Sequence, residues 1–410
     1  MEHVLVVFLY INIFLLLIYF DIKKYSLTSP EVFMLFFIFI AVYPVIRNFG
    51  QELNAIITVL YLIFIWSYML GCGYAKAINS APVNKHRSWN IERLFKIGIA
   101  VFAFSMILWY VGVELTGGFE ALLSSSRQEK MLSGRAYGFL GIYNDLLIVS
   151  IVLLAVTYYK TGKKAVLIIL SIAVGIKILI ALVYTSRNFI LEVLMLIIVF
   201  REFFHNKRIS VRYSVALLVL VIIFGAMFKG VTRNLIISGE IGEISVNIEP
   251  GMLQTQYTVI KDIIKYDDID LDQKFGIGYI KAIFLRSNPF INSPSNSSWY
   301  AKKIYRDKYD SGGGQGFSQI AEGFMAFGPI GVVLVGFFYG YLLRYIYQRA
   351  IHKNLLFISI YSIMIMSVIR ILRSEFTSVF NGYFMYRVIP ILIFFWIARL
   401  SYKKITADRK

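Results

Sequence analysis

Residues Ser311–Gly340 read SGGGQGFSQIAEGFMAFGPIGVVLVGFFYG, and they join a long polar segment to an apolar helix. Gln315, Ser318 and Glu322 are spaced by three and four residues, which predicts that they share one helix face. A carboxylate at that depth is costly in lipid, so we expect Glu322 to face protein or a water-filled cavity. The alternative is a helix end that merely tolerates a glutamate near the lipid headgroups.

The composition around this stretch indicates a membrane protein. Hydrophobic residues make up 58% of the 410 positions and charged residues only 16%. This balance predicts an all-α polytopic membrane protein with about 11 transmembrane helices. The apolar runs are 3–20, 30–46, 53–72, 93–113, 137–159, 165–185, 189–204, 214–230, 317–343, 354–372 and 383–400.

The basic residues predict the orientation. The formal net charge is +18, but most lysines and arginines lie in short linkers between apolar runs, which argues against a nucleic-acid partner. Their bias places the N-terminus outside, with an uncleaved first span, and the C-terminus in the cytoplasm. We therefore expect a multi-pass protein of the inner (plasma) membrane.

Three regions follow from this topology. Residues 1–230 form a transmembrane bundle of about eight spans. Residues 231–316 form one large extracytoplasmic loop, whose many aromatic residues argue against disorder and predict a folded lid. Residues 317–410 hold the last three spans and a cytoplasmic tail. Gly336 and Gly340 either permit close helix packing or occur at this spacing by chance.

The sequence lacks the motifs of several common kinds of active site. Cys72 is the only cysteine, and the four histidines lie too far apart in the sequence for a metal-ligand motif. Nucleotide-binding loops and the common metal- or serine-hydrolase motifs do not occur. We therefore expect no cofactor and no metal.

Arginines dominate the predicted outer face, where the orientation rule disfavours them. Arginine grips phosphate through two parallel hydrogen bonds and stays charged in any environment. Arg370 and Arg373 are three residues apart, and Arg187 lies in a tight connection between two spans. Snorkelling to lipid headgroups is the alternative for each of them. The outer arginines are Arg47, Arg127, Arg135, Arg187, Arg233, Arg286, Arg306, Arg370 and Arg373.

Two acids are placed within spans on that side. Glu322 is the favoured candidate for activating a hydroxyl, because a general base must be a positioned group with a tunable pKa. Asp145, in GIYNDLLIV, either contacts substrate or is the hydrogen-bonded partner of a neighbouring arginine.

The pattern resembles the Wzy-type polymerases of O-antigen and capsular polysaccharide. The resemblance covers nearly the whole chain in its architecture. Its most specific piece is GGGQGFSQIAEGFMAFGPIGVVLVGFFYG, and SRNFILE (186–192) and RSEF (373–376) are similar to the family's arginine sites. Arg127 and Gly138 match an Arg-x10-Gly spacing of some members, but the second copy is absent from the large loop.

The resemblance implies transfer of a growing glycan from one polyprenyl-pyrophosphate carrier to another lipid-linked repeat unit. It implies undecaprenyl-pyrophosphate-linked oligosaccharide as substrate, membrane lipids as surroundings, and a chain-length regulator and a flippase as further partners. We expect Glu322, Arg187 and Arg373 to be catalytic. The expected substrate-binding residues are Arg127, Arg135, Arg370, Arg286, Gln315, Ser318 and Asp145.

Two other functions remain open. An O-antigen ligase shares this architecture and donor, but that family is expected to use a histidine in the large loop, and residues 231–316 contain none. A lipid-linked oligosaccharide flippase is the second alternative. Transporters usually show internal repeats, and none is evident here.

Overall fold

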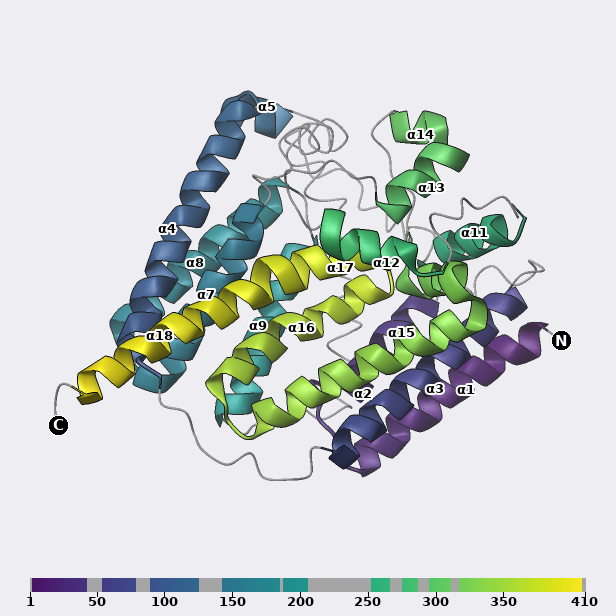
Figure 1. The fold of residues 1–410 in the computed structure, drawn as a ribbon, viewed down its shortest axis with the longest axis horizontal. Helices are drawn as coiled ribbons and strands as arrows, with labels where there is room; N and C mark the ends of the chain where they lie inside the picture. Colours follow the sequence, from purple (N-terminus) through teal and green to yellow (C-terminus); the bar gives the residue numbers. More distant parts are fainter. Residues whose placement is uncertain are drawn as a thin grey trace, which may run out of the picture.

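The computed structural model describes residues 2–42, 54–78, 89–124, 142–184, 187–205, 252–265, 275–286, 295–310 and 317–407. These parts of the chain are helical and hold no strand (Figure 1). The helices, with η for π-helices, are α1 (Glu2–Ile22), α2 (Pro30–Val42), α3 (Asn54–Ile78), α4 (Ile91–Leu115), α5 (Gly118–Ser124), α7 (Ile142–Thr161), α8 (Lys164–Val183), α9 (Arg187–His205), α11 (Met252–Lys265), α12 (Ile277–Lys281), η4 (Ala282–Arg286), α13 (Asn296–Ile304), α14 (Arg306–Asp310), α15 (Gln319–Ile351), α16 (Leu355–Ile371), α17 (Phe376–Val379), η5 (Phe380–Val388) and α18 (Ile389–Ala407).

Several of these helices are long and apolar enough to cross a membrane. Seven such segments occur among the described residues: Val4–Ile22, Ala55–Ile78, Ile91–Leu115, Ile142–Thr161, Lys164–Val183, Gln319–Ile351 and Phe376–Arg399. Two shorter apolar helices, Pro30–Phe39 and Leu355–Ile371, accompany them. The prediction of a helical, multi-span membrane protein is confirmed. The run 214–230 lies outside the described residues, so the count of eleven spans stays a prediction.

Helix α9 coincides with the predicted run 189–204, but it is not among the seven long apolar helices. Glu192, Arg201 and Glu202 interrupt its apolar sequence. Both glutamates are buried. Helix α9 therefore places charged groups inside the bundle, where other helices can pair with them.

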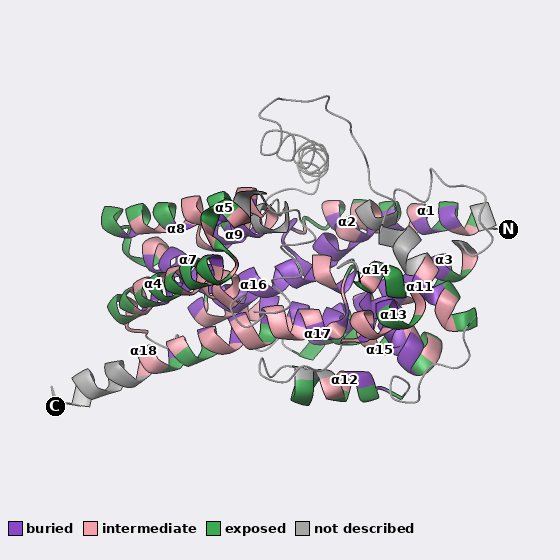
Figure 2. Cartoon of the chain, turned by 90° about the horizontal axis from the view of Figure 1, so that it is seen from above, coloured by how far each residue is buried: buried purple, intermediate pink, exposed green. Residues whose placement is uncertain are grey.

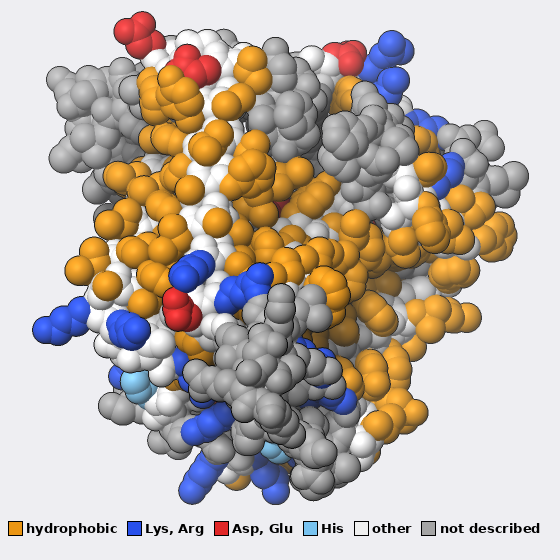
Figure 3. All heavy atoms as spheres, turned by 60° about the vertical axis from the view of Figure 1, so that its left-hand side comes forward, with side chains coloured by type: hydrophobic (Ala, Val, Ile, Leu, Met, Phe, Trp, Pro, Cys, Tyr) orange, Lys and Arg blue, Asp and Glu red, His pale blue; other side chains and the backbone are white. Residues whose placement is uncertain are grey.

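The outer surface of the bundle suits a lipid environment. Figure 2 shows exposed residues along α4 and α8, whereas α16 is almost entirely buried at the centre. On α8 the exposed side chains include Leu167, Ile168, Ile172 and Leu179. Figure 3 shows hydrophobic side chains forming a broad band, with most of the visible lysines and arginines below it and a few at its upper right in that view. A band of this kind is typical of helices that face acyl chains.

Helices α3 and α15 approach closely through glycines. A Cβ atom added at Gly340 would overlap the carbonyl oxygen of Tyr68, and one at Gly336 would lie 2.9 Å from the carbonyl oxygen of Phe64. On α3, a Cβ at Gly71 would overlap the carbonyl oxygen of Phe337. Of the two sequence interpretations of the Gly336–Gly340 spacing, close helix packing is therefore the one that holds.

Replacing Gly340 by alanine is expected to destabilise the protein by about 1–3 kcal/mol, the usual cost of overpacking. The added methyl group would meet backbone of α3, which cannot rotate away as a side chain can. The measurement is the melting temperature of purified protein in detergent. Gly73→Ala is the matched control, because nothing lies within 4 Å of a Cβ added there. Equal melting of both variants would contradict the close packing of α3 and α15.

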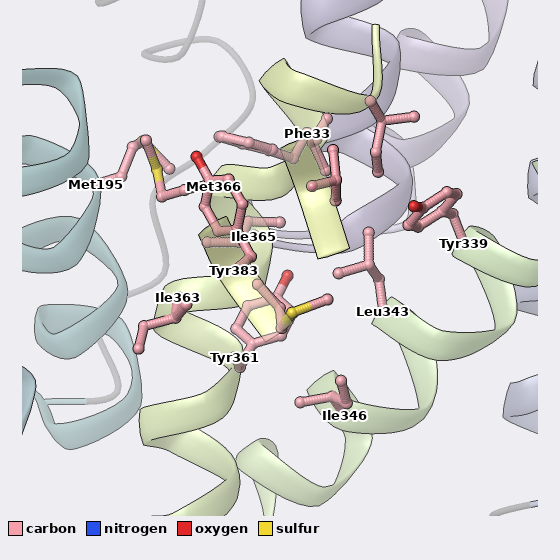
Figure 4. Close-up of a cluster of buried hydrophobic side chains, with 14 of the residues drawn as sticks. Phe33, Met195, Tyr339, Leu343, Ile346, Tyr361, Ile363, Ile365, Met366 and Tyr383 are labelled. Carbon is pink, nitrogen blue, oxygen red and sulfur yellow. The ribbon is translucent and has the colours of Figure 1, made fainter. Parts of the chain in front are cut away.

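The core between α2, α9, α15, α16 and η5 consists of aliphatic, methionine and aromatic side chains. Figure 4 shows Phe33, Met195, Leu343, Tyr361 and Tyr383 among the side chains that meet there. The rings of Tyr347 and Tyr361 are 5.0 Å apart, which is a favourable aromatic distance. This core holds the helices whose ends carry the polar groups described below.

One end of the bundle has its own buried polar contacts. Arg344 Nη1 lies 3.0 Å from Glu31 Oε1, which joins α15 to α2. Glu202 of α9 accepts hydrogen bonds from the hydroxyls of Ser26 and Thr28, the latter at 2.5 Å.

The helices alternate in direction between this end and the opposite one. At this end α1, α3, α7 and α9 finish, and α2, α8 and α16 begin (Figure 1). The opposite end, where α7 and α9 begin and α8 and α16 end, is called the site end below.

Candidate active site

Glu322 connects parts of the chain that are far apart in the sequence. Its Oε1 accepts a hydrogen bond from Asn296 Nδ2 at 2.6 Å, and its Oε2 accepts one from the backbone N–H of Phe376 at 2.6 Å. The neighbouring Glu375 accepts a hydrogen bond from the backbone N–H of Ser297 at 2.7 Å. These five residues, called the carboxylate clamp below, tie the start of α13 to the starts of α15 and α17.

The clamp explains how two carboxylates are tolerated in the interior. Glu322 and Glu375 are only 1% and 2% exposed. A buried charge is costly unless it is hydrogen-bonded. Ser297 and Phe376 supply backbone N–H groups from the first turns of α13 and α17, where N–H groups have no partner within the helix and the helix dipole favours an anion. Each carboxylate thus also accepts a hydrogen bond from an N–H group that has no partner within its own helix.

Ser318 is the N-cap of α15, and its Oγ accepts a hydrogen bond from the backbone N–H of Ala321 at 3.1 Å. Serine is a preferred N-cap because its oxygen satisfies one of the free N–H groups of the first turn. Ser318 therefore precedes the helix. The backbone N–H of Glu322 donates to the carbonyl of Ser318 at 2.9 Å. Gln315 lies outside the described residues, so a shared face of the three side chains stays a prediction.

Helix α15 contains a sharp kink at Phe327 and Gly328, five and six residues after Glu322. Phe327 and Gly328 have non-helical torsions, with φ +62° at Gly328, and Pro329 follows. A Cβ on Gly331 would overlap the carbonyl oxygen of Gly323. Residues eight apart in a straight helix are separated by about 12 Å along its axis, so residues 319–326 fold back against the rest of α15. Glu322 thus lies on a short folded-back segment and not within the length of a straight span.

A second buried polar group, called the ionic network below, consists of Asp145, Lys177, Glu192 and Arg387. Arg387 Nε lies 2.7 Å from Asp145 Oδ1, and its Nη1 lies 3.0 Å from Glu192 Oε1. Lys177 Nζ is 3.6 Å from Glu192 Oε2 and donates a hydrogen bond to Asn144 Oδ1. The network joins α7, α8, α9 and η5.

Arg387, a member of this network, lies in the π-helix η5. Short π-helical segments inside α-helices often occur at functional sites. Arg387 lies near the end of η5, and its guanidinium also covers the ring of Tyr383 at 4.6 Å. Pro390 follows three positions later, where its missing N–H would interrupt a regular α-helix.

Arg370 and Arg373 lie between the ionic network and the carboxylate clamp. Arg370 is in the last turn of α16, and the backbone N–H of Arg373 donates to its carbonyl at 3.1 Å. Arg370 lies within electrostatic reach of Glu192. Arg373 is exposed and is followed after one residue by Glu375. The turn after α16 therefore connects Arg370, near the ionic network, to Glu375 of the clamp.

The described part of the large loop packs over this end through aromatic and acidic groups. Asp262 on α11 accepts hydrogen bonds from the hydroxyls of Tyr300 and Tyr305, at 2.7 and 3.0 Å. Burial, together with the bond to Asp262, raises the pKa of Tyr300 well above its ordinary value, so this hydroxyl stays protonated and donates. The rings of Tyr279 and Phe376 lie 5.1 Å apart and join α12 to α17.

A family model of the O-antigen polysaccharide polymerase Wzy matches residues 2–405, which is nearly the whole chain. The chain belongs to this family. No curated protein and no solved structure matches it. Membership indicates a membrane protein that acts as a polymerase in polysaccharide synthesis. The resemblance inferred from the sequence is thereby confirmed.

The predicted site residues of this Wzy-family chain fall into three groups. Glu322, Ser318, Asp145, Arg370 and Arg373 lie at the site end. Arg187 is the first residue of α9, and Arg286 is the last residue of η4. Arg127, Arg135 and Gln315 lie outside the described residues. Of the two interpretations of Asp145, the pairing with an arginine is present, and the partner is Arg387.

Sequence reasoning did not assign Lys177, Glu192, Glu375 or Asn296 to the site. Lys177 lies within the predicted apolar run 165–185, and an ionisable residue within a span is by itself a functional signal. Glu192 and Glu375 lie inside SRNFILE and RSEF, where only the arginines were singled out. Asn296 carries no comparable signal, because asparagine is ordinary in a polar loop.

Among the described residues, no group of three His, Cys, Asp or Glu side chains is placed to hold a metal ion. The acids of the clamp and of the network are instead bonded to nitrogen donors.

Proposed function

We propose that this Wzy-family chain is an oligosaccharide repeat-unit polymerase that acts at the outer face of the inner membrane. It transfers a glycan from a polyprenyl-pyrophosphate carrier to a sugar hydroxyl of a second lipid-linked repeat unit. The bond between the anomeric carbon and the pyrophosphate oxygen breaks, and a glycosidic bond to the acceptor oxygen forms. The acceptor loses its proton, and the pyrophosphate carrier leaves.

One observation carries this proposal: the 2.6 Å hydrogen bond from the backbone N–H of Phe376 to Glu322. It brings the arginine-containing turn RSEF next to the glutamate of SQIAEGF, although the two residues are 54 positions apart. A transfer from pyrophosphate needs cations for the leaving group and a carboxylate for the acceptor. Both kinds of group occur at the site end.

The charges around the ionic network support a site for an anion there. In the ionic network, Lys177 and Arg387 are balanced by Asp145 and Glu192. Arg370, close to Glu192, adds a positive charge beyond that balance. We assign pyrophosphate binding to Arg187, Arg370 and Arg373, and guidance of the second lipid-linked substrate to Arg127 and Arg135. Glu322 orients or deprotonates the acceptor hydroxyl.

The orientation belongs to the same proposal. Lys76, Lys160 and Arg349 lie in the last turns of α3, α7 and α15, at the end opposite the site end. Positive residues favour the cytoplasmic side, so the site end and the large loop face outward. Pyrophosphate is a good leaving group, so no nucleotide is required, and the arginines supply the positive charge that a metal ion would otherwise provide.

Replacing Arg370 by glutamine is expected to lower the rate of polymerisation by about 10- to 100-fold, the equivalent of one charge-assisted contact. Arg370→Lys retains the charge but loses the bidentate hydrogen bonds that a guanidinium makes to phosphate, so an intermediate rate is expected. The measurement is the amount of glycan extended per minute by equal amounts of folded protein.

Arg306→Gln on α14 is the matched control, because Arg306 is highly exposed and pairs only loosely, at 3.7 Å, with Asp310. Equal rates for the Arg370→Gln and Arg306→Gln proteins would remove Arg370 from the pyrophosphate site.

A further inference from the structure

The segment formed by α12 and η4 presents apolar side chains outward, although it belongs to the large polar loop. Ile277, Ile280 and Phe284 are 36%, 58% and 72% exposed. The spacing of Ile277 and Ile280 places them on one face of α12, and Phe284 follows four residues later on η4. Phe275, Ile283 and Leu285 nearby are also exposed. A loop surface meeting only water would not gather so many large apolar side chains.

The opposite side of this segment is fixed against the bundle. The Tyr279 ring packs on Phe376 of α17, and Gly278 is buried. The backbone N–H of Phe275 donates to the carbonyl of Ala326 at 3.1 Å, directly before the α15 kink. Gly276 has φ +74°, and a Cβ atom added there would lie 3.0 Å from the ring of Phe327. The apolar face is therefore held in a defined direction.

This face continues the lipid-facing surface of α15. Phe327 at the kink is 44% exposed and Ile330 just after it is 68% exposed. Val333, Leu334 and Phe338 extend the exposed apolar surface along the spanning part of α15. Figure 2 shows α12 at the edge of the bundle, beyond α15 and α17 in that view. The apolar face of α12 and η4 thus lies where the lipid-facing surface of α15 begins.

We propose that α12 and η4 lie in the interfacial layer of the bilayer at the site end, with Ile277, Ile280 and Phe284 among the first acyl carbons. Helices with one apolar face lie at this depth, and their basic residues remain at the headgroups. Lys281, half-buried on the same segment, is placed to do so. The large loop is then anchored to lipid beside the carboxylate clamp. This inference rests on the fold and does not depend on the proposed reaction.

The test uses the full-length protein in lipid nanodiscs. Cys72 is buried, so the wild-type protein provides the unlabelled baseline. Single cysteines at Ile280 and Phe284 are labelled with a nitroxide. Asp307→Cys on α14 is the control, because Asp307 is an exposed residue of the same loop. The accessibility of each label to oxygen, which concentrates in lipid, is compared with its accessibility to a water-soluble nickel complex.

Labels at Ile280 and Phe284 are expected to favour oxygen over nickel, and the label at Asp307 is expected to show the reverse. Nickel accessibility at Ile280 and Phe284 equal to that at Asp307 would overturn the proposal, because the face would then lie in water. Labels shielded from both reagents would also overturn it and would indicate that protein, including a second copy of this chain, covers the face. Both substituted side chains are exposed, so folding is expected to be retained, as a monodisperse elution profile would verify.

Discussion

An Arg387→Met protein is expected to lose about 3–5 kcal/mol of stability, the cost of removing one partner from a buried ion pair. Arg387 is only 2% exposed and contacts both Asp145 and Glu192. Without it, two buried carboxylates would be left with Lys177 and with Arg370, which forms no ion pair with either of them in the described part of the chain. The measurement is the melting temperature of the purified protein, together with the fraction that elutes as a monodisperse species.

Two further variants separate charge from packing. Arg399→Met, lower on α18, is the control, because Arg399 is partly exposed and should tolerate the change. Adding Asp145→Asn to Arg387→Met removes the one carboxylate left without a partner, keeps Glu192 paired with Lys177, and should restore much of the stability. If Arg387→Met melted at the same temperature as Arg399→Met, the ionic network would not be a main determinant of the fold.

Glu322→Gln is expected to reduce polymerisation by about 10- to 100-fold at equal amounts of folded protein, since charge-assisted hydrogen bonds contribute about 1.5–3 kcal/mol. A glutamine retains one acceptor oxygen, but its amide donor would then face another donor, from either Asn296 or Phe376. Asp310→Asn is the matched control, because Asp310 lies on the exposed surface of the same loop.

A companion variant distinguishes the roles of Glu322. If Glu322 acts mainly by holding the loop, Asn296→Ala should reduce the rate to a similar extent. If Glu322 is the base, Asn296→Ala should leave most of the rate, and the Glu322→Gln protein should lose the acid limb of the pH profile. Wild-type turnover by Glu322→Gln at lower expression would instead mean that Glu322 is only structural.

The helical class and most helix positions follow from local sequence. Apolar runs of the right length predict helices wherever the backbone must satisfy its own hydrogen bonds, and this holds at α1, α4 and α8. The kink in α15 is different. The Gly328–Pro329 pair was visible, but the folding back of residues 319–326 depends on the contact between Gly323 and Gly331. Periodicity within one helix does not contain that contact.

The candidate site was predictable in its residue types and not in its pairings. Glu322 was singled out correctly as a buried acid, since an exposed carboxylate in lipid is too costly. Its partners, Asn296 and Phe376, could not be named, because they come from a loop and from another span. Likewise Arg387 and Asp145 are 242 positions apart, and only the packing of η5 on α7 brings them together.

The most direct test of the polymerase assignment uses purified protein in lipid. It is given a polyprenyl-pyrophosphate-linked repeat unit from its own host, a metal chelator, and no other protein or nucleotide. Products resolved by size should form a ladder that rises by whole repeat units. Three results would contradict the account: transfer only to an added lipid A core acceptor, movement of unchanged substrate between leaflets, or a ladder that appears only after a divalent metal ion is restored.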